Sequence, residues 1–166
     1  MRFHLGFLWV LLTLTLTCAA PAAFPAPQNR AQAIAALEAV APERRAEAVL
    51  WLAAHGSMAD QPLLLRRLRD EHEDVRGIAE QGLWRIWSRS GDAAIDRLMA
   101  GGVERMQESR FEEAIAAFSE IIRRKPAFAE GWNKRATVYY LAGDFKRSLA
   151  DCDEVLKRNS SHFGAL

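Results

Sequence analysis

An internal repeat in the C-terminal half constrains the fold of this 166-residue chain more than any other feature. Within residues 95–162, small and apolar residues recur at an offset of 34 positions. The matched pairs are Leu98 and Trp132, Gly102 and Ala136, Phe111 and Phe145, Ala114 and Ser148, Ile115 and Leu149, Phe118 and Cys152, and Ile121 and Val155. A period of this length is typical of stacked helical hairpins, each of which buries its apolar face only against a neighbour.

The N-terminal half repeats at a different offset, 33 residues, because the pattern Ala-Glu-x-x-Leu-Trp occurs at 46–51 and again at 79–84. The second copy continues an apolar stripe at helical spacing, which consists of Val75, Ile78, Ala79, Gly82, Leu83 and Ile86. That spacing indicates one face of a buried helix. We expect Asp74 to cap the free backbone N–H groups at its start.

Helical patterns continue from residue 32 onward, without alternating β-branched runs or Asn-Gly and Asp-Gly hairpin turns. We expect helices at residues 32–40, 43–55, 61–69, 74–89, 92–107, 111–124, 129–142 and 145–157. Short helices separated by short breaks pack as antiparallel neighbours. The sequence therefore predicts an all-α fold, a right-handed α-solenoid of antiparallel helical hairpins.

The 34-residue unit resembles the tetratricopeptide repeat, which favours a large residue at position 4, small residues at 8 and 20, an aromatic at 24 and Pro at 32. Residues 129–162 carry this pattern as Trp132, Ala136, Ser148 and Cys152, together with Tyr139 and Gly143-Asp144-Phe145. Residues 95–128 carry it as Leu98, Gly102, Ala114, Phe118 and Pro126, although Arg105 stands where an aromatic is usual. Residues 31–92 resemble HEAT repeats. Residues 163–166 read as the start of a third tetratricopeptide unit, so we expect the chain to be incomplete at Leu166.

In tetratricopeptide proteins the first helix of each hairpin lines a concave groove that binds a peptide or a partner protein. The resemblance places Met99, Val103, Met106, Asn133, Lys134, Thr137 and Tyr140 in this groove. Met and Val would form an adaptable apolar floor, and Asn133, Lys134 and Tyr140 would donate hydrogen bonds to an extended peptide. A carboxylate clamp of the chaperone-adaptor kind is disfavoured, because Met99 and Val103 occupy the positions of its Lys and Asn.

Nothing in the sequence forms a catalytic constellation. It contains no phosphate-binding Gly loop, no Gly-x-Ser-x-Gly elbow, no His-Glu-x-x-His and no Cys pair of metal spacing. The acidic run at residues 70–74 is interpreted as an exposed turn rather than as a metal site, and Cys152 as a small core residue. With 22 basic and 21 acidic residues, the net charge is +1 and gives no reason to expect nucleic acid as a partner. We therefore predict a protein that is not an enzyme and has no cofactor.

The N-terminus has the features of a secretory signal peptide at residues 1–23. Arg2 precedes an apolar run from Leu5 to Leu16, and small residues that suit cleavage after Ala22 or Ala23 follow. Pro residues then indicate a linker at residues 24–30. We expect a periplasmic or secreted protein, with no membrane contact beyond the signal segment. The alternatives are an uncleaved signal anchor and a lipid at Cys18, although Thr17 departs from the lipoprotein pattern.

The sequence thus predicts an exported scaffold or adaptor for a protein or peptide partner of unknown identity. The alternative is an accessory domain of an enzyme or of a secretion or envelope-assembly machine, whose active part lies on another chain or beyond residue 166. Self-association through the last hairpin is a further mode of contact, because its outer apolar face lacks a following repeat.

Overall fold

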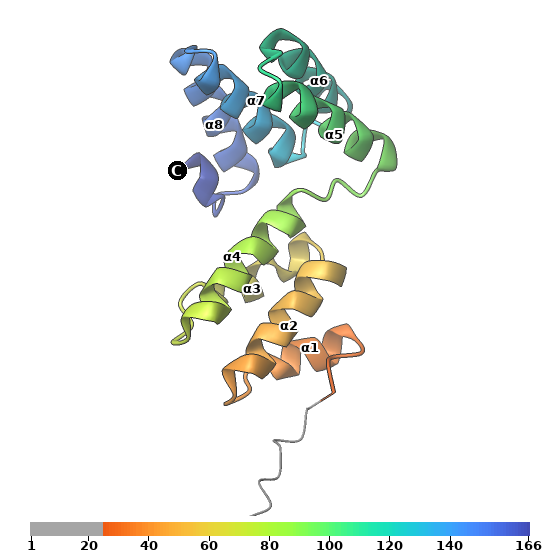
Figure 1. The fold of residues 1–166 in the computed structure, drawn as a ribbon, viewed down its shortest axis with the longest axis vertical. Helices are drawn as coiled ribbons and strands as arrows, with labels where there is room; N and C mark the ends of the chain where they lie inside the picture. The colour runs from red at the N-terminus through yellow and green to blue at the C-terminus, as the bar shows by residue number, and fades with distance from the viewer. Residues whose placement is uncertain (1–24) are drawn as a thin grey trace, which may run out of the picture.

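The computed structural model describes residues 25–166, so the predicted signal peptide at residues 1–23 lies outside the described part of the chain. The described residues form eight α-helices and two 3-10 turns, with no strand among them (Figure 1). The helices are α1 (Arg30–Ala36), α2 (Pro42–His55), α3 (Gln61–Arg67), α4 (Glu73–Trp87), α5 (Ala93–Gln107), α6 (Phe111–Arg124), α7 (Ala129–Leu141) and α8 (Phe145–Arg158). The 3-10 turns are η1 (Met58–Asp60) and η2 (Phe163–Ala165).

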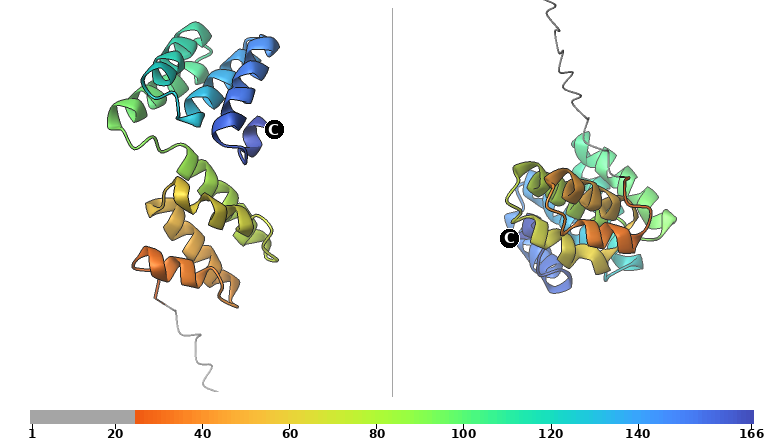
Figure 2. Two further views of the ribbon diagram at one scale, coloured as in Figure 1. Left: turned by 180° about the vertical axis from the view of Figure 1, so that it is seen from behind. Right: turned by 90° about the horizontal axis from the view of Figure 1, so that it is seen from below.

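Helices that are close in sequence pack against one another along the whole described chain. The packed pairs are α1 with α2, α2 with α4, α3 with α4, α5 with α6, α6 with α7, and α7 with α8. In Figures 1 and 2 helices α1–α4 form one stack and α5–α8 a second one, with a short segment between α4 and α5. The predicted all-α solenoid of helical hairpins is confirmed.

Each stack has its own apolar core. In α1–α4 the core is built on the predicted stripe of α4, where Val75, Ala79 and Leu83 are fully buried against α1, α2 and α3. In α5–α8 it is built on Ile95 and Phe118. Phe163, from the C-terminal turn η2, packs against the core of the first stack. The end of the chain therefore ties the two stacks together.

Side-chain hydrogen bonds cap the starts of three helices. Asn29, Asp92 and Asp144 accept bonds from backbone N–H groups at the starts of α1, α5 and α8, which is the favoured role of Asn and Asp at these positions. Most boundaries lie within one or two residues of the predicted ones. Helix α1 is an exception, because it begins at Arg30 and ends at Ala36 instead of spanning residues 32–40.

Arg45 explains the early end of α1. Its guanidinium donates to the carbonyl oxygens of Ala39 and Val40 at 3.0 and 2.8 Å. It also forms two hydrogen bonds with the Asp70 carboxylate, at 2.9 and 2.7 Å. Asp70 is 8% exposed, so the acidic turn at 70–74 is anchored by a buried ion pair at its first residue. The paired Arg45 lowers the pKa of Asp70 below its ordinary value, against the opposing effect of burial.

The predicted capping role of Asp74 is wrong. Helix α4 begins one residue earlier, at Glu73, and its N-cap residue His72 makes no side-chain capping bond. The Asp74 side chain is 81% exposed and lies 3.7 Å from the His72 ring. Glu73 and Asp74 still place negative charge in the first turn, where the helix dipole favours it.

The turn that follows α8 repeats the geometry of the turn that follows α6. Lys125 and Asn159 have similar extended backbone angles, and each N–H donates to a carbonyl four residues earlier at 2.8 Å. Phe128 and His162, also 34 positions apart, cap α7 and η2 with φ and ψ of −82° and 99°, and −78° and 87°. Residues 163–165 therefore form a short turn at the position where α7 begins in the preceding unit.

Among the described residues, no helix combines the length and the apolar character needed to cross a membrane.

Candidate partner-binding face

The structure keeps four of the seven predicted groove residues on one accessible strip. Val103 and Met106 lie on α5, and Thr137 and Tyr140 occupy the matching positions on the neighbouring helix α7. Val103 and Met106 are half-buried, whereas Thr137 is exposed and Tyr140 is 63% exposed. These four residues are called the concave strip below. It offers two flexible or branched apolar side chains beside two hydroxyl groups.

Met99 does not belong to the accessible strip. It is 8% exposed and forms part of the core of the second stack together with Ile95 and Phe118. Met99 lies on the first helix of the hairpin as predicted, but its side chain is buried in the core rather than open to solvent. Its prediction as a groove residue is therefore corrected.

Asn133 and Lys134 are also corrected, because both are engaged inside the chain. The Asn133 side-chain amide donates to the Glu130 carboxylate at 3.1 Å, and Asn133 is 6% exposed. The Lys134 ammonium lies 3.1 Å from the same carboxylate and 5.9 Å from the centre of the Trp84 ring. Each group therefore already has one contact inside the chain, and the Lys134 side chain keeps 27% of its surface exposed.

The partner of Asn133 and Lys134, Glu130, is the centre of a polar cluster where the two stacks meet. Its carboxylate lies 3.1 Å from the His162 ring, and both side chains are fully buried. His162 stacks on Trp87 of α4, with ring centres 4.3 Å apart, and meets Trp84 edge-on at 5.3 Å. We call Glu130, Lys134, His162, Trp84 and Trp87 the junction cluster.

Two amides extend the junction cluster. The Trp87 ring N–H donates to Gln61 at 2.6 Å, and Gln61 in turn donates to Asn159 at 3.0 Å. This bridge connects α3 and α4 of the first stack to the turn after α8. Trp87 is 3% exposed and so lies inside this junction.

Opposing effects act on the pKa of Glu130. Burial raises it, but the hydrogen bond with His162 and the positive charge of Lys134 outweigh burial and hold the pKa below its ordinary value. Glu130 is therefore a carboxylate at neutral pH. Its charge is balanced within the chain, so the cluster joins the two stacks and does not present a reactive acid.

A hollow of about 240 Å³ adjoins the concave strip at the outer end of the second stack. Thr137 and Tyr140 of α7, Ser148 and Cys152 of α8, and Gly164 of η2 contribute to its lining. Burial raises the pKa of the Cys152 thiol, and the negative charges of Asp151 and Asp153 raise it further. The thiol is thus held in its protonated, weakly nucleophilic form.

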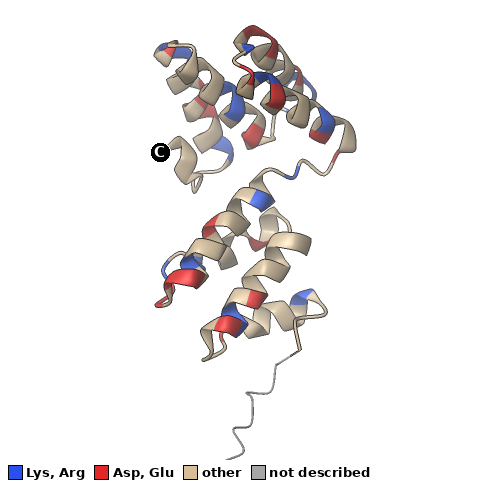
Figure 3. Cartoon of the chain, viewed as in Figure 1, with Lys and Arg blue, Asp and Glu red and all other residues tan. Residues whose placement is uncertain are grey.

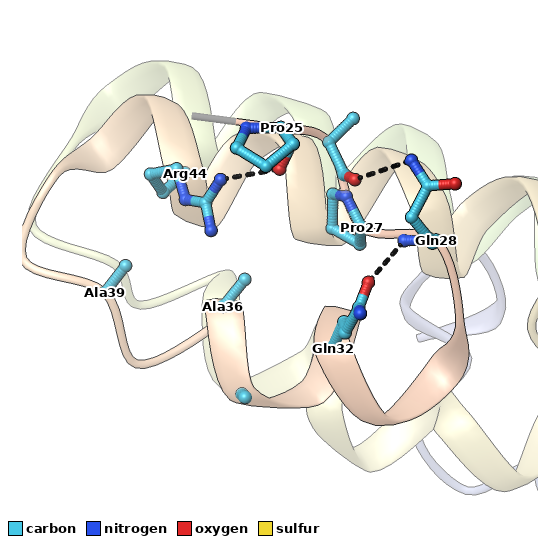
Figure 4. Close-up of a pocket in the computed structure, with 9 residues that line it drawn as sticks. Pro25, Pro27, Gln28, Gln32, Ala36, Ala39 and Arg44 are labelled. Atoms are coloured by element: carbon cyan, nitrogen blue, oxygen red, sulfur yellow. Dashed lines mark hydrogen bonds between the residues drawn. The ribbon is translucent and has the colours of Figure 1, made fainter. Parts of the chain in front are cut away.

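Another hollow, of about 470 Å³, lies between the segment 25–28 and helices α1 and α2 (Figure 4). Its lining is largely Ala and Pro, and its polar groups bind within the chain. Arg44 donates to the carbonyl oxygen of Pro25 at 2.8 Å, and the Gln28 backbone N–H donates to the Gln32 side chain at 2.8 Å. The lining therefore directs no acid, base or nucleophile toward a ligand.

Charged groups do not gather into a surface of one sign. Figure 3 shows acidic and basic residues interspersed over both stacks. Within residues 25–166, no group of three or more His, Cys, Asp or Glu side chains is arranged to hold a metal ion. The accessible feature with a binding character is thus the concave strip and the hollow beside it.

The fold and this face together define an α-helical repeat protein whose hairpins resemble tetratricopeptide repeats. A Rhizobium etli protein described as TPR repeat-containing is 39% identical to this chain over 80 residues. The match spans 48% of this chain and 39% of the relative, so less than half of the relative's length is covered. No family model matches the sequence, and no solved structure matches it. The likeness supports a protein built from helical repeats.

Proposed function

We propose that this chain is an exported, non-enzymatic scaffold or adaptor that binds a protein or an extended peptide on the concave strip. The observation that carries the proposal is the exposure of Tyr140 beside Thr137, on the same strip as the half-buried Val103 and Met106. An amphipathic aromatic side chain beside an adaptable apolar floor is a frequent anchor for protein partners.

The chemistry of the strip favours a partner with an apolar side chain flanked by polar backbone. The Thr137 hydroxyl donates to the Asn133 carbonyl oxygen at 2.9 Å, so it is left with acceptor capacity for a backbone N–H. The Tyr140 ring meets Phe145 edge-on with ring centres 5.5 Å apart, which holds the ring in place. Charge contributes little, since Lys134 is already paired with Glu130.

Capture of a partner from an envelope extract tests the binding role. The immobilised chain is expected to recover a partner, and Tyr140→Ala is expected to weaken the recovery by about tenfold or more because it removes the exposed anchor. Leu50→Ala is a matched control, since Leu50 is 45% exposed on α2, away from the strip. Equal recovery by Tyr140→Ala and by the unchanged chain would rule out the strip as the binding site.

Export is proposed from the N-terminal pattern of Arg2, the apolar run from Leu5 to Leu16 and the small residues after it. The test is the mass and N-terminal sequence of the chain recovered from its native host. A periplasmic or secreted product that begins after Ala22 or Ala23 is expected. A product that retains Met1 in the cytoplasm would contradict export while leaving the binding role of the strip open to its own test.

A further inference from the structure

Helix α8 carries an apolar stripe that the rest of the described chain covers incompletely. Phe145, Leu149, Cys152 and Leu156 follow one another at spacings of four, three and four residues, which places them on one face of the helix. Phe145 is 58% and Leu149 67% exposed, whereas Cys152 and Leu156 are half-buried. The open part of the stripe is thus the N-terminal half of α8.

The same stripe exists 34 positions earlier, where a helix covers it. Its members on α6 are Phe111, Ile115, Phe118 and Ile122. Phe118 is fully buried, Ile122 is 9% exposed, and Phe111 and Ile115 are half-buried within the core of the second stack. Helix α7 packs on α6, and its Val138 shares one core cluster with Phe118, Phe111 and Ile115. The counterpart on α8 is therefore shaped to receive one more helix.

The charged residues on α8 indicate which helix would cover its apolar stripe. Arg147 pairs with Asp144, Asp151 with Arg135, and Glu154 with both Lys157 and Arg158. Of the charged side chains on α8, only Lys146 and Asp153 lack an ion pair with another described residue. Both are exposed, and their spacing of seven residues places them on the same flank of the stripe.

We propose that two copies of this chain associate through α8, with the two α8 helices packed antiparallel about a twofold axis near Leu149 and Ala150. In this arrangement Lys146 of each copy approaches Asp153 of the other. The twofold axis therefore gives the dimer two equivalent Lys146–Asp153 ion pairs. Phe145 and Leu149 of each copy cover the open stripe of the other. The two solenoids then continue into each other through the type of helix contact that already joins α6 to α7.

The association does not require the concave strip. Lys146, Leu149 and Asp153 all lie on α8, whereas the strip is built from α5 and α7. Tyr140 touches Phe145 and is therefore left unchanged in the test. If the chain does not dimerise, the strip can still capture a partner. If no partner is captured, the chain can still dimerise.

Sedimentation equilibrium of the purified chain over a range of concentrations tests the proposal. A reversible monomer–dimer equilibrium is expected. Leu149→Asp is expected to weaken dimerisation at least about thirtyfold, because it places a charge at the centre of the apolar contact in both copies. Leu50→Asp, which changes an exposed leucine of α2, is the matched control and is expected to leave the equilibrium unchanged. Circular dichroism checks that both variants remain helical.

A charge exchange distinguishes this geometry from nonspecific apolar association. Lys146→Asp and Asp153→Lys are each expected to weaken the dimer about tenfold, since each brings like charges together at both symmetric contacts. The double variant K146D/D153K is expected to restore the original dimerisation constant. A chain that is monomeric at every concentration, a dimer that Leu149→Asp leaves unchanged, or a double variant as weak as the single ones would each overturn the proposal.

Discussion

The hairpins α5–α6 and α7–α8 repeat the same residue spacing in two different surroundings. Phe111 and Ile115 are half-buried, whereas Phe145 and Leu149 at the matching positions are more than half exposed. Both helices are built with the same apolar face, but within residues 25–166 it is α6 that a full helix, α7, follows and packs on. The comparison teaches that in a repeat protein the burial of a residue depends on its neighbour unit as much as on its own unit.

The hairpins also differ in how they fill the space between their two helices. The first pairs Gly102 with Phe118, and the second pairs Ala136 with Cys152. A Cβ atom on Gly102 would lie 2.5 Å from the Phe118 ring, so the large aromatic requires the glycine. Where the smaller Cys152 replaces the aromatic, an alanine fits. The second hairpin is filled less tightly here, because Ala136 and Cys152 both line the hollow of about 240 Å³.

Truncating the aromatic of the first hairpin should give the largest effect. Phe118→Ala is expected to lower the free energy of unfolding by about 3–5 kcal/mol, because Phe118 is fully buried and its removal leaves a cavity. Cys152→Ala, at the same position of the second hairpin, removes one half-buried sulfur and is expected to cost less than about 1 kcal/mol. Urea denaturation of both variants measures the difference. Similar losses for the two would show that the hairpins are packed alike after all.

The close contact between Gly102 and the Phe118 ring can be tested directly. Gly102→Ala is expected to lower the free energy of unfolding by about 1–3 kcal/mol, since the added methyl overlaps the Phe118 ring. Gly101→Ala is the matched control, because its methyl meets only the flexible end of Arg105 and should stabilise α5 by up to about 1 kcal/mol. Both variants are compared by thermal and urea unfolding.

A double-mutant cycle separates the overlap from other causes. In the background Phe118→Cys, which copies the pair found in the second hairpin, the added change Gly102→Ala should cost little or nothing. An equal cost of Gly102→Ala in both backgrounds would mean that the phenylalanine is not the reason for the glycine.

Sequence periodicity is sufficient to predict the helices and their stacking, because both depend on local spacing of apolar residues. Seven of the eight helices begin and end within two residues of prediction. The end of α1 could not be predicted, since it depends on Arg45 binding carbonyl groups of the preceding turn while holding Asp70, 25 positions further along the chain.

The candidate site was predictable only in part for the same reason. Repeat positions place Val103, Met106, Thr137 and Tyr140 at matching points of α5 and α7, and none of the four is fully buried in the structure. They do not reveal that Glu130 binds Asn133 and Lys134. The other partner of Glu130, His162, and the Trp84 ring that packs on His162 come from distant segments. One signal was present in the sequence: His162 stands 34 positions after the buried Phe128, at a position that the repeat reserves for the core.

The two hairpins differ in the acidic residue at one repeat position, and we expect this to affect how the free energy of unfolding depends on pH. Its counterpart 34 positions earlier, Asp96, is exposed and accepts a hydrogen bond from Ser90 at 2.5 Å. Glu130→Gln is expected to lower the free energy of unfolding at neutral pH by about 1–3 kcal/mol, since it removes a buried charge that Lys134 and His162 contact. Asp96→Asn, as the exposed control, should have a smaller effect.

The pKa of Glu130 determines how this cost changes with pH. Because the folded state lowers the pKa below the ordinary value of 4.5, the ionised carboxylate contributes its full stabilisation above pH 4.5 and loses it as pH falls through the folded pKa. The difference between the unchanged chain and Glu130→Gln should therefore be constant from pH 7 to about 5 and shrink at lower pH. Unfolding curves in urea at several pH values test this. A difference that grows toward acid pH would show that the sign is wrong.

The smallest expected effect comes from the open stripe of α8. Leu149→Ala should change the free energy of unfolding by less than about 0.5 kcal/mol in dilute solution, because the side chain is 67% exposed. Ile115→Ala, its covered counterpart on α6, should cost about 1–2 kcal/mol, since a half-buried side chain loses part of its contacts. Raising the protein concentration should increase the cost of Leu149→Ala but not that of Ile115→Ala, because a bound second copy stabilises the folded chain by mass action. Costs that are independent of concentration for both variants would mean that the stripe of α8 has no cover in solution.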